Sequence, residues 1–188
     1  QWGQDVQNGN GEAVPCPSSV VGGRRGEVVD SMAKGKRVKL GGDDIAPGFG
    51  LYTDMNAIRT HEQLDNLHSL YVDQWDWEKT ITREDRNLEY LKDTVRSIYR
   101  VIKECESLIY AEFPHITPTL PDEITFIHTE ELLQQYPHLT PKEREAEAAR
   151  RYGAIFLMGI GQQLSDGTRH DGRAPDYDDW TTPNSDGY

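Results

Sequence analysis

The sequence predicts an α+β domain in which an antiparallel sheet is flanked by helices. Three observations support this fold class. Two segments between residues 48 and 79 have the alternating side-chain pattern of neighbouring strands, and a polar loop lies between them. A long stripe of apolar residues then repeats at spacings of three and four, and a capped helical segment precedes a short apolar run near residue 157.

Composition limits the classes of function. The chain has 188 residues with a formal net charge of −12, a size that suits one domain and a charge that repels a phosphate backbone. We therefore expect no nucleic acid as a partner. No apolar run is long enough to cross a membrane. Cys16 and Cys105 lie far apart without metal-ligand spacing, which excludes a zinc ribbon or a disulfide scaffold and favours the cytoplasm.

The second of the two predicted strands has two distinct faces. One face holds Leu70, Val72, Gln74, Asp76 and Glu78, and the other holds Tyr71, Asp73, Trp75 and Trp77. The tryptophans are expected in the core, because aromatic residues at this spacing usually pack against helices. Gln74 and Asp76 admit two interpretations. They form either the wet face of a sheet or a floor of polar groups directed at a substrate.

A long helix is the clearest element, with a start predicted at Thr82 and Asp85. Its apolar stripe comprises Leu88, Leu91, Val95, Ile98, Ile102, Cys105 and Ile109. We expect this stripe to pack across a sheet and Cys105 to be buried.

The elements after this helix are shorter. Residues 123–128 read as a strand, and Thr129 as the cap of a short helix that ends near Tyr136. Thr140, Pro141 and Glu143 predict the start of a further helix that ends at Gly153. Residues 154–160 read as a buried strand.

Two segments carry candidate chemistry. Residues 27–32 read as a strand that leads into a basic cluster, which is either a solvated turn or an anion site. The cluster contains Lys34, Lys36, Arg37 and Lys39.

The second segment is the loop of residues 165–180, which holds five aspartates but lacks the spacing of a calcium loop. His170 beside Asp171 is either a hydrogen-bonded pair or half of an acid/base pair. Arg173 and Asp178 suit the carboxylate and the ammonium group of a zwitterion.

Four sequence strings together resemble the ammonia-dependent asparagine synthetases, or aspartate–ammonia ligases, relatives of the class II aspartyl- and asparaginyl-tRNA synthetases. The strings are DSMAKGKR at 30–37, GLYTDM at 50–55, LHSLYVDQWDWE at 67–78 and the segment from LSDG at 164 through RAPDYDDW to residue 180. The resemblance runs from about Gln4 to Thr182. It implies a class II synthetase-like catalytic core that converts L-aspartate, ammonia and ATP, with Mg²⁺, into asparagine through an aspartyl-adenylate.

The resemblance also implies roles for individual residues. Lys36 would neutralise the carboxylate being activated, and Arg59 would hold the α-phosphate as a second catalytic residue. Arg37 would also contact the nucleotide. The implied substrate-binding residues are Asp5, Ser31, Gln74, Asp76, Arg173 and Asp178.

The chain departs from the family pattern at both ends. The family opens with a strand and helix that form a homodimer contact and closes with a glycine-rich strand and an arginine-bearing helix that clasp ATP. Residues 1–188 are therefore expected to form one partial catalytic domain. The alternative is a noncatalytic paralogue that serves as a binding or structural subunit. A tRNA-charging enzyme is disfavoured, because no anticodon-binding module or basic surface is evident.

Overall fold

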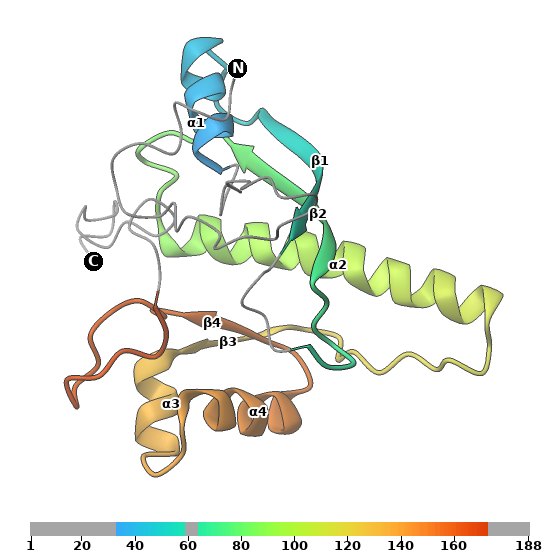
Figure 1. Cartoon of the computed structure of the whole chain (residues 1–188), viewed down its shortest axis with the longest axis vertical. Helices are drawn as coiled ribbons and strands as arrows, with labels where there is room; N and C mark the ends of the chain where they lie inside the picture. The colour runs from blue at the N-terminus through green and yellow to red at the C-terminus, as the bar shows by residue number, and fades with distance from the viewer. Residues whose placement is uncertain (1–32, 59–63, 173–188) are drawn as a thin grey trace, which may run out of the picture. The chain divides into compact units, whose positions relative to one another are not determined.

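A computed structural model describes residues 33–58 and 64–172 (Figure 1). The chain divides into two compact units, residues 1–82 and 83–188. The first unit contains α1 (Ala33–Gly42), β1 (Gly50–Ile58) and β2 (Tyr71–Lys79). The second contains α2 (Leu88–Glu112), β3 (Thr125–His128), α3 (Thr129–Gln135), α4 (Pro141–Tyr152) and β4 (Ile155–Met158). The predicted mixture of helices and strands is confirmed.

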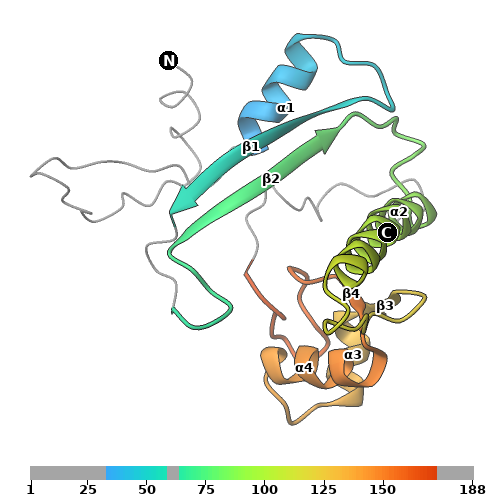
Figure 2. The ribbon, with the colours of Figure 1, turned by 90° about the vertical axis from the view of Figure 1, so that its right-hand side faces the viewer.

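The first unit is built on an antiparallel hairpin. β1 and β2 pair without a bulge from Gly50 opposite Lys79 to Ile58 opposite Tyr71, which confirms the two predicted strands. α1 contacts both strands and lies beside the hairpin in Figure 2. The segment 34–37, one of whose interpretations was a turn, is helical, whereas the strand predicted at 27–32 lies outside the described residues.

The expectation that Trp75 and Trp77 belong to the core is wrong in this structure. Trp75 is 83% exposed and Trp77 is 47% exposed. The reason is the placement of α1, whose Lys36 contacts Asp76 on the opposite face of β2. The polar face of β2 is thus the half-buried one, and the aromatic face is open.

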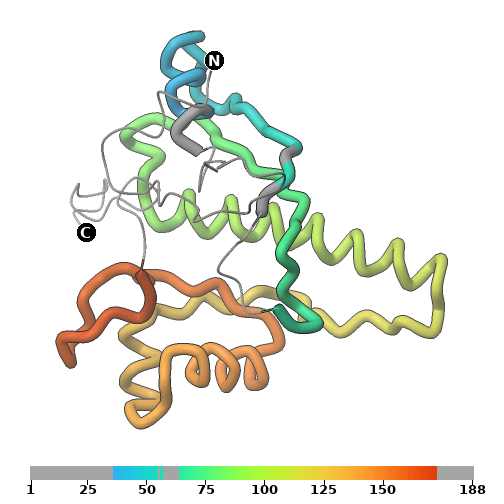
Figure 3. Tube along the Cα trace, in the orientation of Figure 1, coloured from blue at the N-terminus to red at the C-terminus, as the bar shows by residue number. Residues whose placement is uncertain are grey.

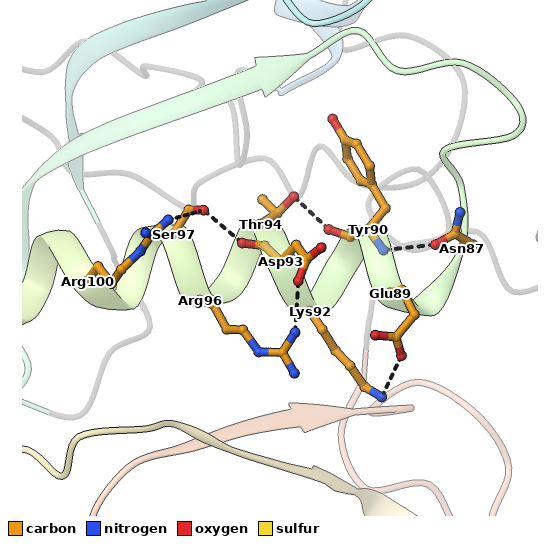
Figure 4. Close-up of polar contacts among 9 residues, drawn as sticks. All are labelled: Asn87, Glu89, Tyr90, Lys92, Asp93, Thr94, Arg96, Ser97 and Arg100. Atoms are coloured by element: carbon orange, nitrogen blue, oxygen red, sulfur yellow. Dashed lines mark hydrogen bonds and ion pairs between the residues drawn. The ribbon is translucent and has the colours of Figure 1, made fainter.

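The predicted long helix is confirmed as α2, but its start differs from the prediction. Asn87 rather than Thr82 is the N-cap, because its side chain accepts a hydrogen bond from the Tyr90 amide at 2.8 Å. Short-range polar contacts follow along the helix, including Lys92 to Glu89 at 3.0 Å and Arg96 to Asp93 at 2.8 Å (Figure 4). Exposed pairs of this kind contribute little stability individually.

Most of the apolar stripe of α2 is exposed, contrary to the prediction. Val95 is buried, but Leu88, Leu91, Ile98, Ile102 and Ile109 are exposed. Cys105 is a free, exposed thiol rather than a core residue. Periodicity shows that these residues share one side of the helix, but it does not specify what covers that side.

Three side chains of α2 make polar contacts with the segment that follows the helix. The Tyr99 hydroxyl donates to the Pro121 carbonyl at 2.6 Å, and Lys103 pairs with Asp122 at 2.7 Å. The Glu106 carboxylate accepts the amides of Thr119 and Leu120, which lowers the pKa of Glu106 below its ordinary value of 4.5.

The second unit contains a pair of parallel strands, which the prediction of an antiparallel sheet did not include. β3 and β4 pair from Thr125 opposite Ile155 to His128 opposite Met158. A parallel pair needs a crossover connection, and α3 and α4 supply it, as the path of the chain in Figure 3 shows. Ile127, Leu132 and Ala148 form the buried core between these elements.

The ends of the two short helices are capped. At α4 the predicted capping box of Thr140 and Glu143 is confirmed, as is the end at Gly153, whose φ is 79°. At α3 the cap is His128 rather than Thr129, because the His128 Nδ1 accepts from the Glu130 amide at 3.1 Å. The Thr129 hydroxyl instead donates to the Gly159 carbonyl at 2.8 Å.

Gly159 occupies a position that other residues fit poorly. Its φ is +74°, and an added Cβ would lie 2.3 Å from the His128 Nε2. The absence of a side chain therefore permits both the backbone conformation and the close approach of the imidazole that caps α3.

Replacement of Gly159 by alanine is expected to destabilise the protein by about 2–4 kcal/mol, from positive φ and overpacking together. Gly167→Ala is the matched control, because Gly167 has a φ of +83° but open space around its Cβ position. Its expected cost is about 1–2 kcal/mol. Urea denaturation measures both, and equal losses would contradict the proposed crowding at His128.

The contact between Glu106 and residues 119–120 predicts a pH dependence. Because the pKa of Glu106 is lowered on folding, the carboxylate stabilises the fold above pH 4.5, and this contribution is lost as the pH falls through the folded pKa. The difference in melting temperature between the wild type and Glu106→Gln should therefore shrink below pH 4.5. A difference that is constant between pH 7 and pH 3 would contradict this assignment.

Candidate functional site

The candidate site of the first unit is centred on an ion pair between α1 and β2. Lys36 is only 5% exposed, although its side chain is cationic. Its Nζ donates to the Asp76 carboxylate, whose side chain is 29% exposed. The pair therefore joins a buried ammonium group to a carboxylate that solvent still reaches.

The neighbours of this pair continue the same polar face. Gln74 and Glu78 flank Asp76 at spacing two on β2, and all three are half-buried. Arg37 follows Lys36 on α1 and lies 3.3 Å from the Glu78 carboxylate. The Thr53 hydroxyl, on the paired strand, donates to the Asp76 carbonyl at 3.3 Å. Two cations of α1 thus lie against two acids of β2.

Packing, rather than helix propensity, brings these charges together. α1 contains Gly35, Gly41 and Gly42 within ten residues, and glycine is a poor helix former. Contacts with the hairpin must therefore stabilise this helix. A buried ammonium group is costly without a partner, so the position of Asp76 also determines which side of α1 faces the sheet.

The arrangement suits a small zwitterion. A carboxylate such as Asp76 attracts an ammonium group, and Lys36 attracts a carboxylate at the same place. The amide of Gln74 offers both a donor and an acceptor beside them. The face thus presents groups that complement each charge of an amino acid.

Four of the sequence-predicted site residues lie in the described part of the first unit, and the structure brings them together: Lys36, Arg37, Gln74 and Asp76. The others lie outside the described residues: Asp5, Ser31, Arg59, Arg173 and Asp178. Sequence reasoning missed the pairing of Arg37 with Glu78. The alternation that placed Glu78 on the same face as Asp76 was the signal that could have found it.

Within residues 33–58 and 64–172, no group of three or more His, Cys, Asp or Glu side chains could hold a metal ion. No helix of the described chain is long and apolar enough to cross a membrane.

The second unit holds a separate polar cluster in the loop after β4. The His170 ring does not pair with the adjacent Asp171 as its position suggested. Its Nε2 lies 2.9 Å from the Glu145 carboxylate of α4, whereas the Asp171 carboxylate accepts the Gly172 amide. Sequence reasoning missed Glu145 because 25 residues separate it from His170.

Comparison with known proteins decides the family. A family model described as aspartate–ammonia ligase matches residues 3–186. The chain belongs to the aspartate–ammonia ligase family. This membership confirms the family that the four sequence strings resembled.

Curated relatives of this family share more than half of the aligned residues. The aspartate–ammonia ligase of Bacteroides thetaiotaomicron is 54% identical over 178 residues, which are 95% of this chain and 52% of the relative. That of Fusobacterium nucleatum is 58% identical over 173 residues, which are 92% of this chain and 53% of the relative. The chain thus spans about half the length of these relatives.

The asymmetric burial of Lys36 and Asp76 predicts asymmetric mutational costs. Asp76→Ala leaves a buried ammonium group without a partner and is expected to destabilise the protein by about 2 kcal/mol, less than the roughly 3–5 kcal/mol of a fully buried pair. Glu78→Ala is the matched control on the same face, and it should lower the free energy of unfolding by less than about 1 kcal/mol. Urea denaturation at pH 7 tests both, and equal costs would show that Lys36 is not held by Asp76.

Proposed function

We propose that the protein is an AMP-forming ligase that makes L-asparagine from L-aspartate, ammonia and ATP. The single observation that carries this proposal is the Lys36–Asp76 pair on the Gln74 face of β2, in a chain of the aspartate–ammonia ligase family. The proposed setting is a class II synthetase-like core in the cytoplasm. Family likeness further suggests a homodimer.

The proposed reaction has two steps. An oxygen of the aspartate side-chain carboxylate attacks the α-phosphorus of ATP, and pyrophosphate leaves. Ammonia then attacks the carbonyl carbon of the aspartyl-adenylate, AMP leaves, and the attacking nitrogen releases a proton. Negative charge grows on the transferring phosphoryl oxygens in the first step, so nearby cations lower its barrier.

Lys36 and Asp76 have complementary tasks in this proposal. Asp76 binds the ammonium group of aspartate, and Lys36 binds the side-chain carboxylate. Because these residues pair with each other in the described structure, aspartate would exchange one ion pair for two. That exchange favours a ligand that carries both charges over a simple amine or a simple carboxylic acid.

The remaining predicted residues complete the proposed site. Gln74 orients the substrate from the same strand, and Asp5, Ser31, Arg173 and Asp178 add contacts to aspartate. Arg59 holds the α-phosphate. Arg37 is proposed to contact the nucleotide, which requires it to leave Glu78, 3.3 Å away. Mg²⁺, when bound with ATP, would neutralise charge on the phosphates.

Lys36→Ala in the intact protein is expected to reduce formation of AMP by at least about 100-fold, because it removes the cation proposed to bind the carboxylate that attacks ATP. Lys39→Ala is the matched control, since Lys39 is an exposed lysine of the same helix that pairs with Asp43. The assay measures AMP with aspartate, ATP and ammonium together and with each omitted in turn. Full activity of Lys36→Ala would remove this residue from the catalytic machinery.

The alternative is a noncatalytic paralogue that acts as a binding or structural subunit. Thermal denaturation with aspartate and ATP distinguishes the two functions. A ligand present at 100 times its dissociation constant stabilises a protein by about 2.7 kcal/mol. A folded protein that forms no AMP, and whose melting temperature does not rise with aspartate or ATP, would favour the noncatalytic paralogue.

A further inference from the structure

The two ion pairs between α1 and β2 differ in their exposure to solvent. The Lys36 side chain is 4% exposed, whereas the Arg37 side chain is 40% exposed. Glu78, which lies 3.3 Å from the Arg37 Nε, is 21% exposed. A charged molecule that approaches this face from solvent therefore reaches the side chain of Arg37 more readily than that of Lys36.

Folding accounts for the first ion pair better than for the second. Lys36 needs Asp76, because a buried ammonium group without a partner is costly. Arg37 is solvated to a much greater extent, so its pair with Glu78 contributes little to the stability of the fold. The presence of a carboxylate at position 78 thus calls for a reason besides stability.

A carboxylate at this place also affects the binding of anions. The formal charges of Lys36 and Arg37 are balanced by those of Asp76 and Glu78 in the described structure. Carboxylates and phosphates offer a guanidinium group the same kind of acceptor, an oxygen atom that bears negative charge. A phosphate group that binds Arg37 must therefore compete with the carboxylate of Glu78.

We infer that Glu78 is an intramolecular competitor for Arg37, whose carboxylate holds the guanidinium group until a phosphate group of ATP displaces it. The inference rests on the proposed function, in which Arg37 contacts the nucleotide. Glu78 acts through Arg37 and is in this sense a positioning residue. Its consequence is a lower affinity for nucleotide than the cations of α1 alone would give.

The exposure of the pair sets the size of this effect. Partly exposed ion pairs shift an equilibrium by a factor of about two to five. If Arg37 binds ATP only after it has left Glu78, the apparent Kd for ATP exceeds the intrinsic Kd by a similar factor. Removal of the carboxylate should therefore tighten the binding of ATP. A purely structural role of Glu78 predicts the opposite, since a loosened α1 would bind ATP less well.

Isothermal titration calorimetry of the intact protein tests this sign, with ATP and Mg²⁺ present and aspartate and ammonium omitted. Glu78→Gln keeps the size of the side chain but removes its charge, and the Kd for ATP should fall about two- to fivefold. An unchanged or higher Kd for ATP in Glu78→Gln would overturn the inference.

Asp43→Asn is the matched control for a general effect of charge. Asp43 is an acid with a 44% exposed side chain that pairs with Lys39 of α1. Six residues separate it from Arg37, about 9 Å along a helix, and salt weakens interactions over that distance. The Kd for ATP should therefore stay unchanged in Asp43→Asn. Equal tightening by Asp43→Asn and Glu78→Gln would show that any lost acid has the same effect, and the inference would be wrong.

A double-mutant cycle tests whether Glu78 acts through Arg37. Arg37→Gln should weaken the binding of ATP, and the double variant Arg37→Gln with Glu78→Gln should bind ATP no more tightly than Arg37→Gln does. Tightening of the same size in both backgrounds would contradict competition for the guanidinium group.

The same titrations separate this inference from the proposed function. A wild-type protein that binds no ATP would overturn both together. A wild-type protein that binds ATP and forms AMP, but whose Kd for ATP is the same in Glu78→Gln, would overturn the competition by Glu78 and leave the proposed function intact.

Discussion

Burial of one ammonium group constrains the first unit. Lys36 lies among the buried residues of a strongly acidic chain, and the free energy of burying its charge is tolerable only because Asp76 accepts its hydrogen bond. This requirement sets the rotation of α1 about its axis and selects the face of the hairpin that the helix contacts. It also explains how a segment with three glycines in ten residues can be helical where it packs against the strands. The candidate site and the packing of this unit therefore depend on the same contact.

In the described part of the second unit, side-chain hydrogen bonds fix several of the connections between elements. Glu106 holds the segment after α2, His128 begins α3, and Glu130 and Glu145 hold the loop after β4. The buried core is small, with Ile127, Leu132 and Ala148 at its centre. Such polar contacts are directional, so they fix the positions of short connections that a small core would leave loosely determined.

Local sequence signals located the helices and strands well, but they predicted poorly which faces of these elements are buried. Periodicity located α2, and the Thr140 and Glu143 box located the start of α4, because these signals depend on residues close in sequence. The Trp75 and Trp77 prediction failed because alternation separates the two faces of a strand without saying which face a helix covers. The parallel pairing of β3 with β4 was missed because it joins segments about 30 residues apart, which local patterns do not relate.

The candidate site shows the same division. Alternation predicted that Gln74 and Asp76 share a face, which the structure has, but their association with Lys36 came from family resemblance alone. His170 was singled out because its loop is dense in aspartates and arginines. Its partner Glu145 lies on another element, and no local pattern points to it. Physical reasoning from sequence thus finds candidate groups more readily than it finds their partners.

The bulge-free register of β1 and β2 makes the first unit sensitive to changes in chain length. Side chains alternate between faces, so inserting a single residue within β2 before Asp76 would transfer every later side chain to the opposite surface. Tryptophan would then lie against α1, and the carboxylates would point away from Lys36. Length variation among natural homologues should accordingly be confined to positions outside the two strands, however freely their surface residues differ.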